Sequence, residues 1–330
     1  MNQPRFSVII PVYNRPQELD ELLESLHHQS HKNFEVVVVE DGSTVRSDAV
    51  VERYADRLKI KYFFKQNSGP GPSRNFGFSH AAGEYFVVFD SDCIIPPEYF
   101  AQVERSLEIN KWDAWGGPDR AHESFTTLQR AMGYTMSSVL TTGGIRGGKK
   151  RLGWFQPRSF NMGISRAVYE KTQGFRFDRF AEDIEFSIRM RNSGFKVGLI
   201  PEAYVFHKRR TSFGGFYDQV FNFGRGRVLV GKAFPEEVKA THWFPALFVI
   251  SVSSLLILPF LYVPLFFLGL GILAFYLIAI FFHSWLSNNS LKVAILSVPS
   301  AWLQLWGYGL GFLRERFASA ETDNQENKPT

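Results

Sequence analysis

Two carboxylates stand one residue apart at the end of a short apolar run. The run Gly83 to Phe89 is followed directly by Asp90, Ser91 and Asp92. Asp and Ser after a strand commonly form a solvated turn or cap the next helix. Carboxylates at a sheet edge can also hold a hard divalent cation, and the oxygens of a diphosphate could complete its coordination shell. The triplet alone therefore predicts either a turn or a site for a metal and a diphosphate.

Strands and helices alternate in the first part of the chain. Residues 6–12 and 34–39 are continuous apolar runs that predict buried strands, and 60–64 predicts a third. Between the first two runs, Pro16 opens a segment with leucines at helical spacing. After the third run, the segment from Gly69 to Ala82 is amphipathic. This alternation predicts an α/β fold with a mainly parallel sheet flanked by helices.

Ligands of such sheets gather beyond the carboxyl ends of the strands, where Asp41 and Asp92 both fall. A dinucleotide site is disfavoured, because the first strand-to-helix turn, 12–16, has no glycine. The glycines of the stretch 69–73 alternate with prolines, which lack the backbone N–H that a phosphate cradle needs.

A second group of polar residues comes later in the chain. Asn161 begins an Asn-Met-Gly-Ile-Ser-Arg stretch, and Glu182 and Asp183 open a helical pattern that Gly194 ends at a C-cap position. Acids in a first helical turn stabilise the helix dipole by about 0.3–1 kcal/mol without any chemistry. Spacing alone does not separate that role from catalysis.

The order of these motifs resembles the family-2 glycosyltransferases with the GT-A fold. The resemblance covers roughly residues 5–210. The motifs that carry it are Ser7-Val-Ile-Ile-Pro-Val-Tyr-Asn14, Glu40-Asp-Gly-Ser43, Arg74-Asn75, Asp90-Ser-Asp92 and Glu182-Asp183.

The resemblance implies a site for a nucleotide-diphosphate sugar, with UDP as the default nucleotide. It places Asp41 on the base, and it places Glu40 where the family more commonly has Asp. Pro11 and Tyr13 would shape the pocket for base and ribose. Asp90 would face the ribose or a metal-bound water.

The resemblance also implies a metal ion, Mg²⁺ or Mn²⁺. Asp92 matches the metal-ligating acid of the family, and His207 resembles the histidine that some GT-A enzymes add to the metal shell. A lone histidine is more often a core or surface residue than a metal ligand. Arg74 is expected to bind the donor, with a solvated cation at a helix start as the alternative.

The family places its catalytic base at the second acid of the Glu-Asp pair, which is Asp183 here. A carboxylate within about 3 Å can take the proton of an attacking hydroxyl. Glu182 and Asn161 are expected at the acceptor. Because no second carboxylate is assigned as nucleophile, the expected reaction is direct displacement with inversion.

Composition limits which other classes of protein this chain could belong to. The 330 residues carry a net charge of +5, but no nucleic-acid recognition motif accompanies it, so we expect no nucleic acid partner. The single Cys93 excludes an internal disulfide framework and a cysteine-based zinc cluster. The apolar run at 6–12 is too short for a signal peptide. Residues 1–211 are predicted to form the catalytic domain.

The last third of the chain predicts a membrane region. Residues 212–242, rich in Phe, Gly and Arg, are expected to lie on the membrane surface as an amphipathic linker. Residues 243–283 carry no charge before the terminal histidine and hold roughly twice the ~20 residues that one crossing needs. We expect a transmembrane hairpin that reverses between Pro259 and Pro264, with both outer ends in the cytoplasm.

Residues 291–316 form a third membrane-associated segment, for which two forms compete. A crossing would leave Arg314 and Arg316 outside, whereas an interfacial helix keeps them in the cytosol and is favoured. The polar tail 318–330 is expected to lack order. The aromatic helices could pair with copies of themselves as a membrane homo-oligomer.

The sequence thus predicts an inverting, non-processive, metal-dependent glycosyltransferase of the inner membrane, multi-pass, with its catalytic domain in the cytoplasm. The acceptor is expected to be a lipid-linked glycan or polyprenyl phosphate. A processive polysaccharide synthase is disfavoured, because its Gln-x-x-Arg-Trp motif is absent. The alternative from another class is a non-catalytic membrane subunit that keeps the fold as a binding scaffold.

Overall fold

The computed structural model describes residues 3–120, 122, 124–142 and 154–318. By their contacts they separate into two units. The first is built from residues up to 122 and from 154–208, and the second from 124–142 and 209–318. The predicted catalytic range 1–211 therefore includes a stretch that packs with the carboxyl-terminal helices. The tail predicted to lack order lies, apart from Ala318, outside the described residues.

The first unit contains two sheets and the helices that cover them. Its elements are β1 (Phe6–Val12), α1 (Pro16–His27), β2 (Phe34–Asp41), α2 (Asp48–Glu52), β3 (Ile60–Lys65), α3 (Pro70–Ser79), β4 (Tyr85–Phe89), β5 (Cys93–Ile94), α4 (Tyr99–Asn110), β6 (Ala114–Gly116), β7 (Asp119–Arg120), β8 (Asn161–Ser165), α7 (Arg166–Thr172), α8 (Glu182–Asn192), β9 (Val197–Leu199) and β10 (Val205–His207). The strands and helices expected up to residue 82 are confirmed, with ends that differ by a few residues.

The main sheet has seven strands in the order β3-β2-β1-β4-β8-β6-β9. Strands β3, β2, β1 and β4 run parallel, and β8 is antiparallel to both of its neighbours. A small second sheet has the order β5-β10-β7. The expected mixed α/β fold with a mostly parallel sheet is confirmed, and β8 is the exception that the alternation of apolar runs did not indicate.

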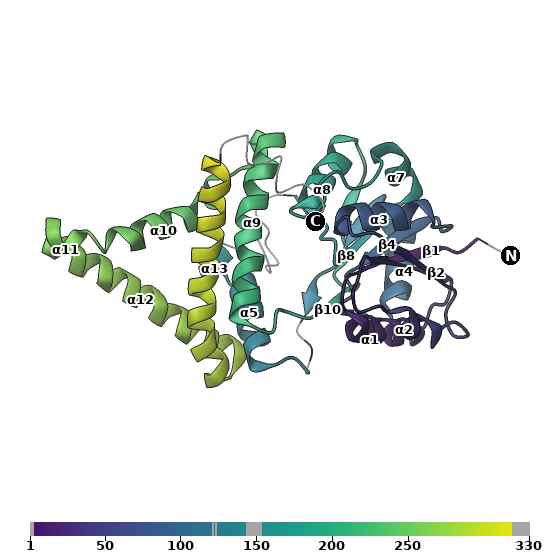
Figure 1. Ribbon diagram of the computed structural model, residues 1–330, viewed down its shortest axis with the longest axis horizontal. Coiled ribbons are helices and arrows are strands. Elements are labelled where there is room, and N and C mark those ends of the chain that lie inside the picture. Colours follow the sequence, from purple (N-terminus) through teal and green to yellow (C-terminus); the bar gives the residue numbers. More distant parts are fainter. Residues whose placement is uncertain (1–2, 121, 123, 143–153, 319–330) are drawn as a thin grey trace. The chain divides into compact units, whose positions relative to one another are not determined.

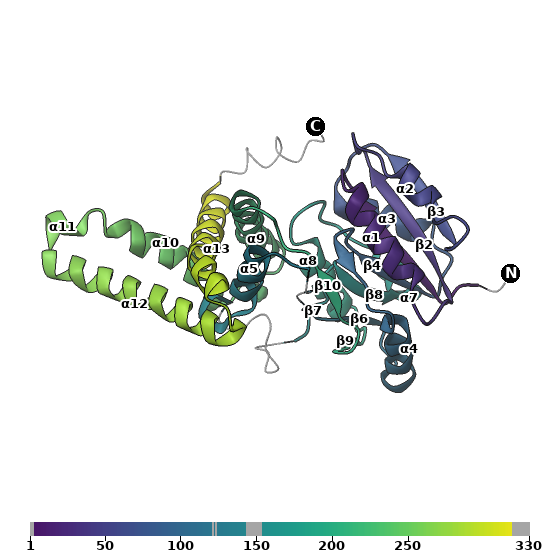
Figure 2. The same ribbon diagram turned by 90° about the horizontal axis from the view of Figure 1, so that it is seen from below.

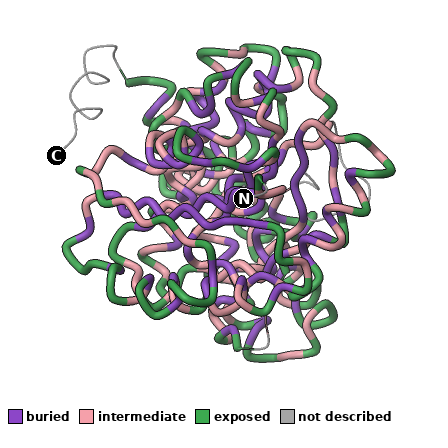
Figure 3. Tube along the Cα trace, turned by 90° about the vertical axis from the view of Figure 1, so that its right-hand side faces the viewer, coloured by how far each residue is buried: buried purple, intermediate pink, exposed green. Residues whose placement is uncertain are grey.

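Both faces of the main sheet are buried. Alternate residues of β1 such as Val8 and Ile10 pack under α1 and α4, while Ile9 packs with Phe78 of α3 and Phe186 of α8 on the opposite face. Figure 1 shows α1 and α3 on opposite sides of these strands. In Figure 3 the buried residues run through the middle of this unit and the exposed ones lie around its rim. Burial on both faces explains why these strands read as continuous apolar runs.

The second unit is helical. Its elements are α5 (Thr127–Ser137), α6 (Val139–Thr142), α9 (Phe213–Ala233), the short 3₁₀ turns η1 (Pro235–Glu237) and η2 (Ala240–Trp243), α10 (Phe244–Ser254), α11 (Leu258–Leu261), α12 (Val263–Asn288) and α13 (Leu291–Phe317). Helix α9 corresponds to the predicted amphipathic linker. Around Pro259, where the sequence predicts a reversal, the helical stretch is divided into α10, α11 and α12.

Helices α9 and α13 lie side by side in both ribbon views (Figures 1 and 2). Small residues bring their backbones together. A Cβ atom added to Gly224 would lie 2.1 Å from the carbonyl oxygen of Tyr308, and one added to Gly311 would lie 2.0 Å from that of Phe221. Close packing through glycine is typical of helices in membranes.

Within the described residues, one helix, α12, is long and apolar enough to cross a membrane. The sequence predicted a crossing by each arm of a hairpin. Helix α10, in the first arm, has 11 residues, which is fewer than the ~17 that a crossing needs. The structure thus supports one candidate span.

Candidate active site

The end of β4 and the start of α8 are joined by one arginine. The Arg74 guanidinium, from α3, donates through Nη2 to Asp90 Oδ1 at 2.7 Å and through Nη1 to Glu182 Oε1 at 2.8 Å. Arg74 is 3% exposed, so this is a buried ion-pair network. The guanidinium also lies over the ring of Phe175. Residues separated by more than a hundred positions in the chain are thereby fixed at one edge of the sheet.

The alternating glycines and prolines before Arg74 have a structural role here. Gly71 N donates to the carbonyl of Asp178 at 2.9 Å, and a Cβ on Gly71 would lie 2.3 Å from the carbonyl oxygen of Phe177. Only glycine allows this approach. The motif therefore packs the start of α3 against the segment that leads into α8, which brings Arg74 within reach of Glu182.

Glu182 is buried beside both a cation and an anion. Burial raises its pKa, Arg74 lowers it and the neighbouring Asp183 raises it, and the net result is a pKa of about 7. The carboxyl group of Glu182 therefore gains or loses its proton near neutral pH. Asp90 and Glu182 share the single positive charge of Arg74, so the charge of this network depends on pH.

Asp183, the predicted base, lies in the first turn of α8. Its Oδ1 accepts the backbone N–H of Ile184 at 2.8 Å, and its Oδ2 lies 3.6 Å from Arg158 Nη1. Ala181, just before α8, has a φ of +56°. A left-handed conformation costs a residue with a Cβ roughly 1–2 kcal/mol, and such strain gathers where the surrounding structure must aim a functional segment.

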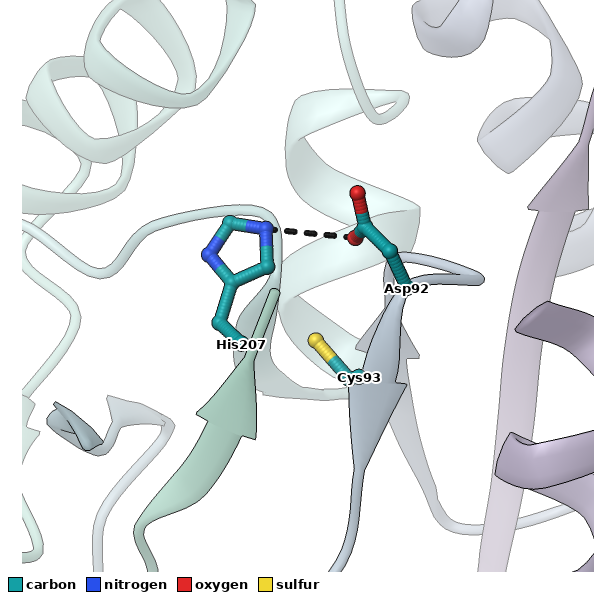
Figure 4. Close-up of side chains that lie close together, drawn as sticks. All are labelled: Asp92, Cys93 and His207. Carbon is teal, nitrogen blue, oxygen red and sulfur yellow. Dashed lines mark ion pairs between the residues drawn. The ribbon is translucent and has the colours of Figure 1, made fainter. Parts of the chain in front are cut away.

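Asp92 and His207 lie side by side at the end of the small sheet (Figure 4). His207 Nε2 is 3.2 Å from Asp92 Oδ1. The register of β5 and β10 places them together, because Cys93 pairs with His207. The ring of His207 stacks on Phe160 at a centroid distance of 4.7 Å. The sequence proposed His207 as a partner of Asp92, and the structure brings the two together.

The second oxygen of Asp92 is paired with Arg15, whose Nη1 donates to Oδ2. Burial raises the pKa of Asp92, but the neighbouring His207 and Arg15 lower it more strongly, so the pKa lies well below the usual range of an aspartate. Asp92 is therefore an anion at neutral pH.

The pair fits a divalent cation. Among the described residues, Asp92 Oδ1 and His207 Nδ1 are buried without a conventional hydrogen-bond partner, and the other ring nitrogen of His207, Nε2, faces Asp92 Oδ1 at 3.2 Å. The Sγ of Cys93 completes a group of ligand atoms within 4.8 Å of one another. Burial raises the pKa of the Cys93 thiol, and a neutral thiol is a poor ligand for Mg²⁺ or Mn²⁺, which prefer oxygen and imidazole. Of this group, Asp92 and His207 are thus the two residues that suit such an ion.

The two acids at the end of β2 are engaged in holding loops. Glu40 is fully buried and accepts hydrogen bonds from the backbone and hydroxyl of Ser47 and from Tyr62. Asp41 accepts the backbone N–H groups of Ser68 and Gly69, each at 2.9 Å. Its contact with a nucleotide base stays a prediction, as does a donor role for Glu40.

The other predicted site residues differ in exposure. Tyr13 is 52% exposed beyond β1 and is free to contact a ligand, and Pro11 is partly exposed. Asn161, predicted at the acceptor, is fully buried. Its amide accepts from Tyr99 at 2.6 Å and donates to the carbonyl of Ala203 at 2.8 Å. The structure therefore gives Asn161 a place in the core, and its acceptor role stays a prediction.

Sequence reasoning missed Arg15 and Arg158. Each pairs with a predicted site acid, Arg15 with Asp92 and Arg158 with Asp183. Arg15 stands in the turn 12–16, where the sequence predicts roles for Tyr13 and Pro16 but none for Arg15. The position of that turn, at the carboxyl end of β1 beside β4, was the available signal.

Known proteins support a family assignment. The profile described as Glycosyl transferase family 2 matches residues 7–172, half of this chain. The chain is 42% identical over 109 residues to an uncharacterized glycosyltransferase of Rickettsia conorii, covering 33% of this chain and 18% of that protein. It is 39% identical over 111 residues to an uncharacterized glycosyltransferase of Haemophilus influenzae, covering 33% and 43%. The chain thus spans less than half the length of these relatives.

A solved structure shows the same fold. The chain superposes on the mannosyltransferase PcManGT of Pyrobaculum calidifontis, determined in complex with GDP-Man and Mn²⁺, with a TM-score of 0.59. The sequences are 18% identical, and the match covers 96% of this chain and 88% of PcManGT. From the ordered motifs, the sheet and the extent of the profile match, the chain belongs to glycosyl transferase family 2.

Proposed function

We propose that this protein is an inverting, non-processive, metal-dependent glycosyltransferase that moves a sugar from a nucleotide-diphosphate sugar to an acceptor at a membrane. The observation that carries the proposal is the pairing of Asp92 with His207, with a buried carboxylate oxygen left for a cation, in a chain of family 2. Asp90 and Glu182, joined through Arg74, bring the segment of the predicted base to the same sheet edge.

Mg²⁺ or Mn²⁺ at Asp92 and His207 would neutralise the diphosphate leaving group. The structural neighbour PcManGT was determined with GDP-Man and Mn²⁺, which supports a nucleotide-sugar donor and a metal of this type. Asp92 is ionised at neutral pH, and His207 presents an imidazole nitrogen beside it.

Asp183 would accept the proton of the acceptor hydroxyl. The hydroxyl oxygen forms a bond to the anomeric carbon while the bond from that carbon to the diphosphate oxygen breaks, and the proton passes to the carboxylate. Because attack and departure occur on opposite sides, the anomeric configuration inverts. Arg158, 3.6 Å from Asp183, is the cation beside the proposed base. A polyprenyl phosphate acceptor would already be ionised and would depend less on Asp183.

The second unit would attach the enzyme to the membrane. Helix α12 is long and apolar enough to cross a bilayer, and its side chains are largely exposed. Holding the enzyme at the bilayer raises the effective concentration of a lipid-linked acceptor without further protein contacts. The catalytic unit on the cytoplasmic side has access to cytosolic sugar nucleotides.

The proposal is tested with membranes that contain the full chain. They are incubated with labelled UDP-, GDP- and dTDP-sugars, with and without Mn²⁺, and transfer to lipid is measured. We expect one donor class to be used, with transfer lost on chelation and in Asp92→Asn. An exposed acid of the same unit, Asp178, provides the matched control variant Asp178→Asn.

The outcomes separate the candidate functions. Transfer that survives both chelation and Asp92→Asn would contradict the metal site. Neither transfer nor hydrolysis with any donor would favour the binding-scaffold alternative. Long products from a single acceptor would favour the processive synthase.

A further inference from the structure

The hairpin of the second unit has an apolar tip. Between Ser254 and His283 the only side chains with polar atoms are those of Tyr262 and Tyr276. At the tip, Leu256 is 77% exposed and Phe260 is 87% exposed. A hairpin that crosses a bilayer twice presents its turn to water on the far side, where polar and charged residues are normally found. This turn presents leucine and phenylalanine.

Much of the backbone of the tip is paired internally. The N–H groups of Leu255, Leu256 and Ile257 donate to carbonyls three residues earlier, and those of Phe260 and Tyr262 donate within the next turn. Pro259 and Pro264, which flank the reversal, have no N–H. The Ser254 hydroxyl donates to the Ser251 carbonyl at 2.7 Å. In hydrocarbon each polar backbone group must be satisfied internally, and the donors named here are.

The first arm is shorter than the hydrocarbon core. It consists of α10 (11 residues), three turn residues and α11 (four residues), and runs from Phe244 to Leu261. Even as one continuous helix these 18 residues would span about 27 Å at 1.5 Å per residue, against a core of ~30 Å. Leu247 and Ile250 of α10 are 56% and 53% exposed, so α10 is no core helix.

The two arms are also splayed. The first arm contacts α13 where Pro245 meets Gly309, and the second contacts it where the hydroxyls of Ser284 and Ser297 lie 2.7 Å apart. These anchor points are twelve residues apart on α13, which corresponds to about 18 Å. The arms converge from this base, as Figure 1 shows. Oblique arms carry the tip less deep than their length allows.

We propose that residues 244–288 form a re-entrant hairpin that enters a lipid bilayer from one face, ends inside the hydrocarbon and returns to the same face. The hairpin contacts lipid, because the exposed side chains around both arms are apolar. The nearest charged residues, Lys239 and Lys292, lie outside the two arms. This inference rests on the membrane attachment in the proposed function. It replaces the predicted pair of crossings, and the crossing for which α12 alone is long enough, with none.

The test uses single cysteines in the full chain. Phe260→Cys marks the tip, and Asn289→Cys marks the base after α12, where Asn289 is exposed. The unaltered chain gives the background from Cys93, which is buried. Sealed vesicles of each orientation are treated with a membrane-impermeant maleimide, and then with a lipophilic maleimide.

The expected result is that Asn289→Cys reacts from one face only, whereas Phe260→Cys reacts with the impermeant reagent from neither face and with the lipophilic reagent in both. Reaction of Phe260→Cys from the face opposite Asn289→Cys would establish a crossing and overturn the inference. Reaction from the same face would place the tip in water and overturn it as well.

A charge at the tip gives a second measurement. Phe260→Lys should lower the ratio of membrane-bound to soluble chain by about 10²-fold, the effect of a charge near the bilayer centre. Phe317→Lys, at an apolar residue that is 78% exposed at the end of α13, should leave that ratio unchanged. Equal ratios for the two variants would contradict a buried tip. If Phe260→Cys is protected from the impermeant reagent but the chain transfers no sugar, the proposed function is refuted and the re-entrant hairpin is still supported.

Discussion

The two units differ in where their large apolar side chains lie. In the first, charged residues such as Arg74 and Glu40 are buried and the large apolar side chains fill the core. In the second, the apolar side chains of α12 are exposed and the closest contacts are made by glycines. A buried charge needs a partner because water is excluded, whereas an exposed phenylalanine needs a solvent other than water. Each unit is thus built for its own surroundings, the first for water and the second for a less polar solvent.

The largest expected effect lies in the first unit. Asp183→Asn should lower the rate of transfer to a hydroxyl acceptor by about 10²–10⁴-fold, because an amide cannot accept the proton. Affinity for the nucleotide sugar, measured by calorimetry, should not change. A loss of donor affinity equal to the loss of rate would show that Asp183 binds the donor and does not act as the base.

Breaking the buried arginine network should come next. Arg74→Met leaves Asp90 and Glu182 without their shared cation, which should destabilise the fold by about 3–5 kcal/mol. Arg74→Lys keeps the charge but cannot form the same pair of bonds from a planar fork. We expect the melting temperature of Arg74→Lys to stay close to that of the natural chain. Its kcat should fall by a larger factor than its KM changes. The exposed Arg176→Lys is the control, and a similar effect there would deny Arg74 any special role.

In the second unit, stability should depend on close helix contact. Gly311→Ala places a Cβ 2.0 Å from the Phe221 carbonyl oxygen, so α9 and α13 must move apart at a cost of about 1–3 kcal/mol. Gly271→Ala is the matched control, because nothing lies within 4 Å of its added Cβ. Melting of the purified full chain in detergent measures both. Equal melting temperatures would mean that this contact does not hold the unit together.

The smallest effect is a dependence on pH. The pKa of Glu182 is raised to about 7 from a model-peptide value of 4.5, so between these limits the folded chain keeps a proton that the unfolded chain releases. The free energy of unfolding therefore falls as pH rises through this window. Glu182→Gln cannot titrate, so its melting temperature relative to the natural chain should increase from pH 5 to pH 8. A constant difference would contradict the raised pKa.

Continuous apolar runs and their spacing were enough to predict β1, β2, β3 and α1, because strands buried on both faces leave a strong local signal. The break near Pro259 could also be predicted, because proline lacks the N–H that a helix needs and disrupts the helix locally. The acids at the strand ends could be named because parallel strands place their carboxyl ends at one edge. These properties depend on neighbours in the chain, and the sequence determined them.

Tertiary structure alone decided which charges meet. Arg74 bridges Asp90 and Glu182, and Arg15 reaches Asp92, through contacts between residues 16 to 108 positions apart. It also decided that Asn161 is buried and that α10 ends after 11 residues. Spacing in a chain carries no information on such pairings, because they arise only when helices and strands pack and water is excluded from the groups between them.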